Sequence, residues 1–203
     1  MPPAFPALVP NRLEPANHFH AAKAVLPFSV GDFWRWAASD LASNALRGSL
    51  AEFLVAKALG VELTVRAAWD TYDLRVPLGP TIEVKSTAYL QTWGQSRLSR
   101  PCFRISPTVA WSNDMGTYAG AAERRRHADL YVFALLHHTD KATLDPTNVD
   151  QWTFLVLRSA ILDTQVGAQR TITLAALQRL RPITCRFDLL ANAVWAAATE
   201  IGT

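Results

Sequence analysis

The sequence predicts a single α/β domain with a central mixed β-sheet flanked by helices, and three observations predict it. Residues 44–59 repeat apolar side chains at helical spacing. Residues 61–68, 72–77 and 81–90 have the length and composition of consecutive short strands. Residues 129–136 form a near-continuous apolar run, which is typical of a buried central strand.

Composition agrees with this fold class. The chain has 203 residues, which is enough for one well-buried domain and short for two. It is 50% hydrophobic and 18% charged, so it is globular rather than disordered. The net charge of +3 and the pI of about 9.1 lean basic without requiring a polyanionic partner. No secretory signal, membrane span or CxxC pair is recognised, so we expect a cytoplasmic protein with no membrane partner.

The chain divides into a proline-rich N-terminal arm, residues 1–28, and a domain, residues 29–203. Ser29 followed by Asp32 resembles a capping box and predicts a short helix directly after it. The longer helix over 44–59 ends before Gly60, a residue suited to the position after a helix because it accepts positive φ.

The 44–59 helix has two distinguishable faces. Its predicted core stripe is apolar and consists of Leu46, Leu50, Phe53 and Leu54. Its neighbouring face is almost all small and consists of Ala45, Gly48, Ser49, Glu52 and Ala56. Small residues let a helix approach a sheet closely, so we expect Glu52 to be held near the sheet; the alternative is a solvated helix acid.

The remaining elements follow from the same patterns. Further strands are expected at 102–107 and 151–157, a short polar helix at 117–127, and helices at 171–180 and 187–199. Three adjacent arginines, 124–126, point in three directions on the polar helix and are interpreted as a solvated face.

The hairpin over 72–90 carries the chemistry. In a strand, residues two apart face the same side, so Glu83 and Lys85 face together. A two-residue turn would put Asp73 on the opposite face. A three-residue turn, residues 78–80, pairs Arg75 with Glu83 and Asp73 with Lys85, and it keeps apolar residues together. We therefore expect all four polar groups on one face, with Arg75 favouring the ionised form of Glu83.

Three carboxylates and one lysine on this frame suit phosphodiester hydrolysis. Mg²⁺ binds one or two carboxylates together with water and phosphate oxygens, which Asp73 and Glu83 can provide. Glu52 would complete the metal shell or act as a base, and Lys85 would orient water or neutralise developing charge. Lys85 alone among the lysines has an acid two residues before it. The competing interpretation is a salt-bridged polar face of an ordinary hairpin.

The helix acid, the strand acid and the Glu83-Val84-Lys85 tripeptide together resemble the PD-(D/E)XK nuclease superfamily, which has the restriction-endonuclease-like fold. The resemblance covers about residues 44–136. It implies an αβββαβ core, Mg²⁺ or Mn²⁺ as cofactor, Asp73, Glu83 and Glu52 as metal ligands, and DNA as substrate. Tyr72 stands where many members have proline, and Asp70 competes with Asp73 as the metal acid.

The resemblance also implies contacts to DNA. Gln91, or Tyr89, would lie near the scissile bond. The candidate phosphate-binding arginines are Arg47, Arg97, Arg100 and Arg104. Two other functions stay open: a catalytically inactive nuclease-fold module that binds nucleic acid or supports assembly, and a structural protein using its tryptophans at an interface. The choice between endo- and exonuclease, and between monomer and homodimer, stays open too.

Overall fold

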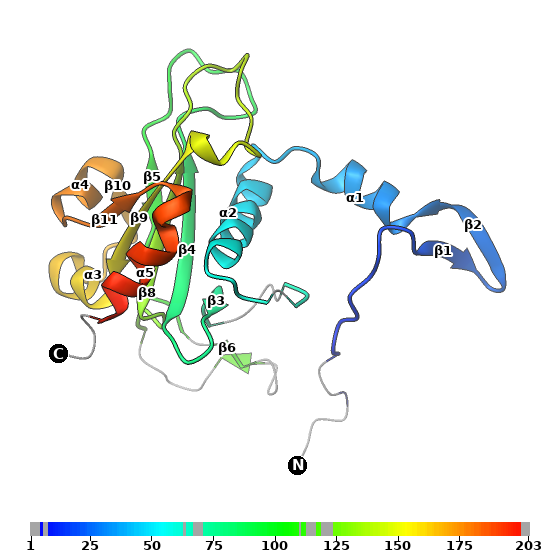
Figure 1. Cartoon of the computed structure of the whole chain (residues 1–203), viewed down its shortest axis with the longest axis horizontal. Helices are drawn as coiled ribbons and strands as arrows, with labels where there is room; N and C mark the ends of the chain where they lie inside the picture. Colours follow the sequence, from blue (N-terminus) through cyan, green and yellow to red (C-terminus); the bar gives the residue numbers. More distant parts are fainter. Residues whose placement is uncertain are drawn as a thin grey trace.

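A computed structural model of the whole chain shows a mixed sheet with helices on both faces and an N-terminal arm projecting from this body (Figure 1). The structure describes residues 5, 8–62, 64–66, 71–109, 111–112, 117–118 and 124–199.

The central sheet has five strands in the order β11-β9-β8-β4-β3. The strands are β3 (Leu74–Arg75), β4 (Thr81–Ala88), β8 (Leu130–Leu136), β9 (Trp152–Arg158) and β11 (Ile183–Cys185). β4 and β8 are parallel, and the other neighbours are antiparallel. Every residue of β8 is buried, as expected for a central strand. The predicted mixed sheet with flanking helices is confirmed.

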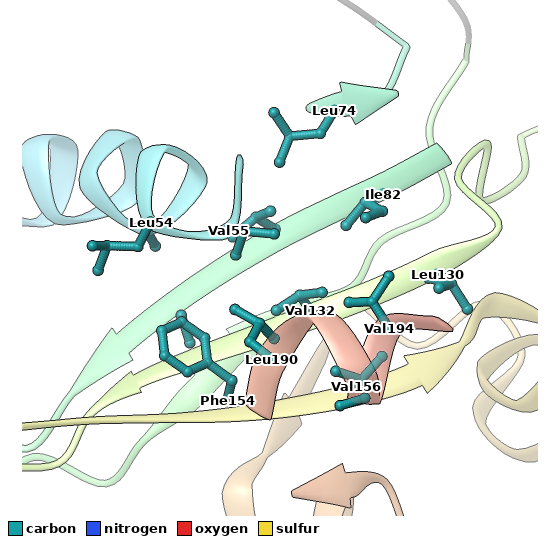
Figure 2. Close-up of a cluster of buried hydrophobic side chains, with 14 of the residues drawn as sticks. Leu54, Val55, Leu74, Ile82, Leu130, Val132, Phe154, Val156, Leu190 and Val194 are labelled. Carbon is teal, nitrogen blue, oxygen red and sulfur yellow. The ribbon is translucent and has the colours of Figure 1, made fainter. Parts of the chain in front are cut away.

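Helices cover both faces of this sheet. They are α2 (Asn44–Ala58), α3 (Ser159–Val166), α4 (Leu174–Arg179) and α5 (Leu190–Thr199), with single 3-10 turns η1 (Val149–Gln151) and η2 (Phe187–Leu189). α2 and α5 enclose one core against β4, β8 and β9 (Figure 2). α3 and α4 enclose the second core on the other face, with β5 (Cys102–Arg104) and its partner β10 (Thr171–Thr173).

The N-terminal arm contains regular structure. The hairpin β1 (His18–Ala21) and β2 (Ala24–Ser29) leads into α1 (Val30–Ala38), and most of its side chains are exposed. The predicted capping box is confirmed, because the Ser29 hydroxyl accepts from the Asp32 amide while the Asp32 carboxylate accepts from the Ser29 amide. The predicted boundary after residue 28 falls inside β2, just before its last residue, Ser29.

The buried face of α2 agrees with the predicted stripe only in part. Leu54 is buried, and Leu50 packs against the core. Phe53 is 46% exposed, whereas Ala51 and Val55 are fully buried against the sheet. Of the predicted small face, Ala56 is fully buried in the core, whereas a side chain added at Gly48 would meet nothing within 4 Å. Gly60 follows α2 with a φ of +65°, so the predicted positive φ after the helix is confirmed.

Three local predictions are wrong for the described residues. Residues 61–62 and 64–66 are not a strand, and β3 is only two residues long, because β3 is the edge of the sheet and these residues find no strand to pair with. Thr117–Tyr118 is strand β7, paired with β6 (Trp111–Ser112), rather than the start of a helix. Between β4 and β8 the described residues contain short strands and no helix.

Candidate active site

Asp73 lies directly before β3 and is fixed against β4 by two hydrogen bonds. Its amide donates to the Ile82 carbonyl at 3.1 Å, and its Oδ2 accepts from the Val84 amide at 2.7 Å. The second bond holds the Asp73 carboxylate beside the segment that carries Glu83 and Lys85. A backbone N–H aimed at a carboxylate oxygen fixes its orientation without using any other side chain.

The register of the hairpin differs from the predicted one by two residues. Arg75 pairs with Thr81, so five residues, 76–80, connect the strands instead of three. Two backbone hydrogen bonds hold this longer connection: the Gly79 amide donates to the Val76 carbonyl, and the Val76 amide donates to the Pro80 carbonyl. The predicted pairing of Arg75 with Glu83 is therefore wrong; the Arg75 guanidinium instead donates to the Tyr72 hydroxyl at 2.8 Å.

A shift of two residues preserves the face on which every side chain lies, because the period of a strand is two. Asp73, Glu83 and Lys85 thus remain on one face of the hairpin. Lys85 donates to the Glu83 carboxylate, and both side chains are largely shielded from solvent, at 28% and 20% exposed. Asp70, the alternative metal acid, lies outside the described residues, so the choice between Asp70 and Asp73 stays open.

The electrostatics of Asp73 show how closely the acids are grouped. Burial raises the pKa of Asp73 to about 7, and the negative charge of Glu83 contributes to the same direction. Lys85 opposes this rise, Glu52 adds to it, and the Val84 hydrogen bond opposes it. The charges of Glu52, Glu83 and Lys85 therefore all act on Asp73.

Glu52 reaches this region from α2, which packs on the face of β4 opposite to Glu83. Its carboxylate receives two hydrogen bonds from Arg66, from Nε at 2.5 Å and from Nη2 at 2.7 Å. β3 is a short strand at the edge of the sheet, and Glu52 and Arg66 lie near Asp73 at this edge. Glu52, Arg66 and Asp73 line one cavity of about 440 Å³. Glu83 and Lys85 lie beside this cavity rather than in its lining.

Two functional candidates were not predicted from the sequence. Arg66 is the ion-pair partner of Glu52, and the sequence pattern places it in a strand. Tyr131 lies opposite Glu83 in the parallel pairing of β4 and β8 and is buried. Burial and the charge of Glu83 raise the pKa of the Tyr131 phenol above its ordinary value. A uniformly apolar strand such as β8 gives no sequence signal of which face each residue occupies.

Two of the predicted DNA-binding residues are buried, which corrects those predictions. Arg47 is 4% exposed, and its guanidinium donates to the Ala42 carbonyl and the Asn44 side chain. Gln91 is 8% exposed, and its side chain donates to the Ala88 carbonyl. Both side chains support local backbone and are not presented to a phosphate.

The other predicted arginines are exposed. Arg97 and Arg100 lie in the loop after β4, and Arg104 ends β5. β5 packs on the face that carries Lys85, because Phe103 contacts Phe133, the β8 partner of Lys85. Arg126, interpreted as solvated, is buried and bonds to Asp163, Ile105 and Gly167.

The donor set fits a cation that takes few protein ligands. Within the described part of the chain, no three His, Cys, Asp or Glu side chains form a complete metal cage. Burial and, after it, the negative charge of Glu83 nevertheless raise the pKa of Asp73. A divalent cation between Asp73 and Glu83 would relieve the repulsion of their charges, and Mg²⁺ commonly binds one or two carboxylates and fills its remaining positions with water and phosphate.

The fold and this cluster define a class of protein: a mixed α/β domain with an acid and lysine site at the open edge of its sheet. Comparison with protein families then identifies the chain more closely. Residues 35–174 match the family described as bacteriophage T4 endonuclease IV, and the chain belongs to that family. The matched region contains Glu52, Asp73, Glu83 and Lys85.

This membership supports an endonuclease that acts on DNA. No curated protein matched the chain. No solved structure matched it either. Among the described residues, no helix is long and apolar enough to cross a membrane.

Proposed function

We propose that this protein is a Mg²⁺- or Mn²⁺-dependent endonuclease that cleaves DNA with a site of the PD-(D/E)XK kind. One observation carries the proposal: the Val84 amide fixes Asp73 beside the paired Glu83 and Lys85. The acid of one strand and the acid and lysine of the next are thus brought to one place. The family match supports the nuclease class independently of this geometry.

Asp73 and Glu83 are the residues that would hold the cation. When bound, the metal would supply Lewis-acid polarisation of the phosphate and a lowered pKa for a water molecule. Asp73 is oriented for this role by the Val84 amide, and Glu83 by Lys85. Glu52 is a third candidate ligand, although both of its oxygens are engaged by Arg66.

Lys85 has the role of stabilising charge during cleavage. Hydrolysis forms one phosphorus–oxygen bond from water and breaks one to the sugar oxygen, which takes up a proton. Negative charge grows on the phosphate oxygens as this happens, and a fixed ammonium group beside them stabilises it. Glu83 holds the Lys85 ammonium in place before substrate arrives.

The test is a cleavage assay on plasmid and linear DNA with Mg²⁺, with Mn²⁺ and with EDTA. We expect cleavage only with a divalent metal, and its loss in Glu83→Ala and Lys85→Ala. Salt-dependent DNA binding by the wild type with no cleavage under any of these conditions would favour the inactive binding module instead.

A further inference from the structure

We propose that Arg66 is the residue that binds a DNA phosphate in the cavity beside Asp73, and that Glu52 positions Arg66 instead of ligating the metal. This inference rests on the proposed function and names the residue that recognises the substrate there. It starts from the ion pair that joins α2 to the segment before β3.

The first step is the geometry of the guanidinium. Arginine has five N–H donors in a planar fork. Nε and one N–H of Nη2 are used by the two Glu52 oxygens. Within the described part of the chain, Nη1 has no hydrogen-bond partner. The pair with Glu52 thus fixes the plane of the group and leaves its outer edge for another anion, which is the edge that suits a phosphate.

The second step is exposure. The Glu52 side chain is 15% exposed, whereas the Arg66 side chain is 51% exposed. The acid is therefore the inner member of the pair and the cation is the outer one. A surface ion pair formed only for stability contributes little, and it has no reason to place its acid inside a cavity.

The third step is the surroundings. The cavity of about 440 Å³ is lined by Arg66, Arg75 and Asp73 among others. The same lining includes three acids, Glu52, Glu62 and Asp73. Glu52 is paired with Arg66, and Asp73 is the proposed metal acid. Arg66 and Arg75 are therefore the two cationic groups of this lining that a phosphodiester would meet. The hydrogen bonds to Glu52, together with the negative charges of Glu52 and Asp73, raise the pKa of Arg66, so it stays cationic.

The role of Glu52 changes accordingly. A carboxylate that accepts two hydrogen bonds from one guanidinium would have to break both to become a metal ligand. In the proposed arrangement it keeps them and holds Arg66 toward the phosphate, while Asp73 and Glu83 hold the cation.

The experiment measures binding in EDTA, so that no cleavage occurs. Anisotropy of a fluorescently labelled oligonucleotide, duplex and single-stranded, is recorded over a series of NaCl concentrations. The variants are Arg66→Ala, Glu52→Gln, the double variant and Arg186→Ala. Arg186 is the matched control, because it is an exposed arginine paired with Asp150 beside β11, at the opposite edge of the sheet.

We expect Arg66→Ala to weaken binding by about tenfold and to reduce the slope of log K against log salt by about one. Glu52→Gln should weaken binding in the same assay, and the double variant should bind no more weakly than Arg66→Ala. Arg186→Ala should match the wild type.

Two outcomes would overturn the inference: Arg66→Ala equal to Arg186→Ala in affinity and slope, or no salt-dependent binding by the wild type. Unchanged binding in Glu52→Gln, with a raised metal requirement for cleavage, would return Glu52 to the metal shell and overturn its positioning role. If the wild type bound through Arg66 but cleaved nothing with metal, the proposed function would fail while the phosphate site stood. If the wild type cleaved DNA with metal and Arg66→Ala bound DNA normally, the proposed function would stand and the phosphate site would fail.

Discussion

At the residue scale, the site places the carboxyl of Asp73 in an unfavourable buried position. A buried carboxyl whose pKa is raised to about 7 is less stable as an anion in the folded protein than in the unfolded chain. The fold tolerates this because the Val84 amide and Lys85 compensate in part. Such a conflict between stability and local charge is common where a site awaits a ligand of opposite charge.

We predict that Asp73→Asn is more stable than the wild type at pH 8 without metal. The folded state holds the Asp73 proton more tightly than the unfolded state, so this carboxyl lowers stability as pH rises from about 4 to about 7. The difference should be about 4 kcal/mol at pH 8 and close to zero at pH 4. Urea denaturation at both values measures it, and an equal difference at the two pH values would contradict the account.

Lys85 gives the second prediction at this scale. Lys85→Ala should lower kcat for DNA cleavage by about 100-fold or more, with a smaller effect on KM, because its charge is needed most as the phosphate becomes more negative. Steady-state kinetics measure both constants. A kcat close to that of the wild type would remove Lys85 from the proposed chemistry.

The hairpin of β3 and β4 is the element that assembles the site. Its alternation could be read from the sequence, and so could the common face of Glu83 and Lys85. Its register could not, because the five-residue connection depends on contacts with a distant helix. A side-chain atom added at Gly79 would lie 2.8 Å from Cη2 of Trp195 on α5 and 3.1 Å from Val76.

We therefore predict that Gly79→Ala destabilises the protein by about 1–3 kcal/mol through this clash. The control is Gly94→Ala, since a side chain added there meets nothing within 4 Å. Thermal or urea denaturation distinguishes the two variants. Equal stability of Gly79→Ala and Gly94→Ala would show that the turn does not rest on α5.

Other elements illustrate the same limit of sequence reasoning. The buried strand β8 and the end of α2 at Gly60 follow from local patterns, since apolar runs and positive φ are local requirements. The burial of Arg47, Gln91 and Arg126 does not, because each depends on backbone carbonyls or acids supplied by the tertiary fold. Arg66 was missed for the same reason, since its partner Glu52 lies fourteen residues earlier.

At the scale of the whole molecule, the site and the arm are separate features. β1, β2 and α1 project from the body (Figure 1). The aromatic side chains Phe33, Trp34 and Trp36 on α1 are exposed. The two buried cores lie in the sheet and its four covering helices. Stability of the body should therefore depend little on the arm.

We predict that removal of residues 1–28 leaves the free energy of unfolding within about 1 kcal/mol of the full-length value. DNA cleavage should also persist. Urea denaturation, the cleavage assay and the molecular mass in solution check this together. Loss of cooperative unfolding, or loss of cleavage with a change in mass, would show that the arm completes the folded unit or its assembly.

The central claim is that Asp73 and Glu83 together hold the cation on which DNA cleavage depends. The most direct measurement is the initial rate of plasmid cleavage as a function of Mg²⁺ concentration for the wild type, Asp73→Asn, Glu83→Gln and Arg186→Ala. The account predicts a saturable metal dependence in the wild type and Arg186→Ala, and no cleavage above background in the two acid variants. Cleavage that persists in EDTA, or that survives in either acid variant with an unchanged metal dependence, would contradict it.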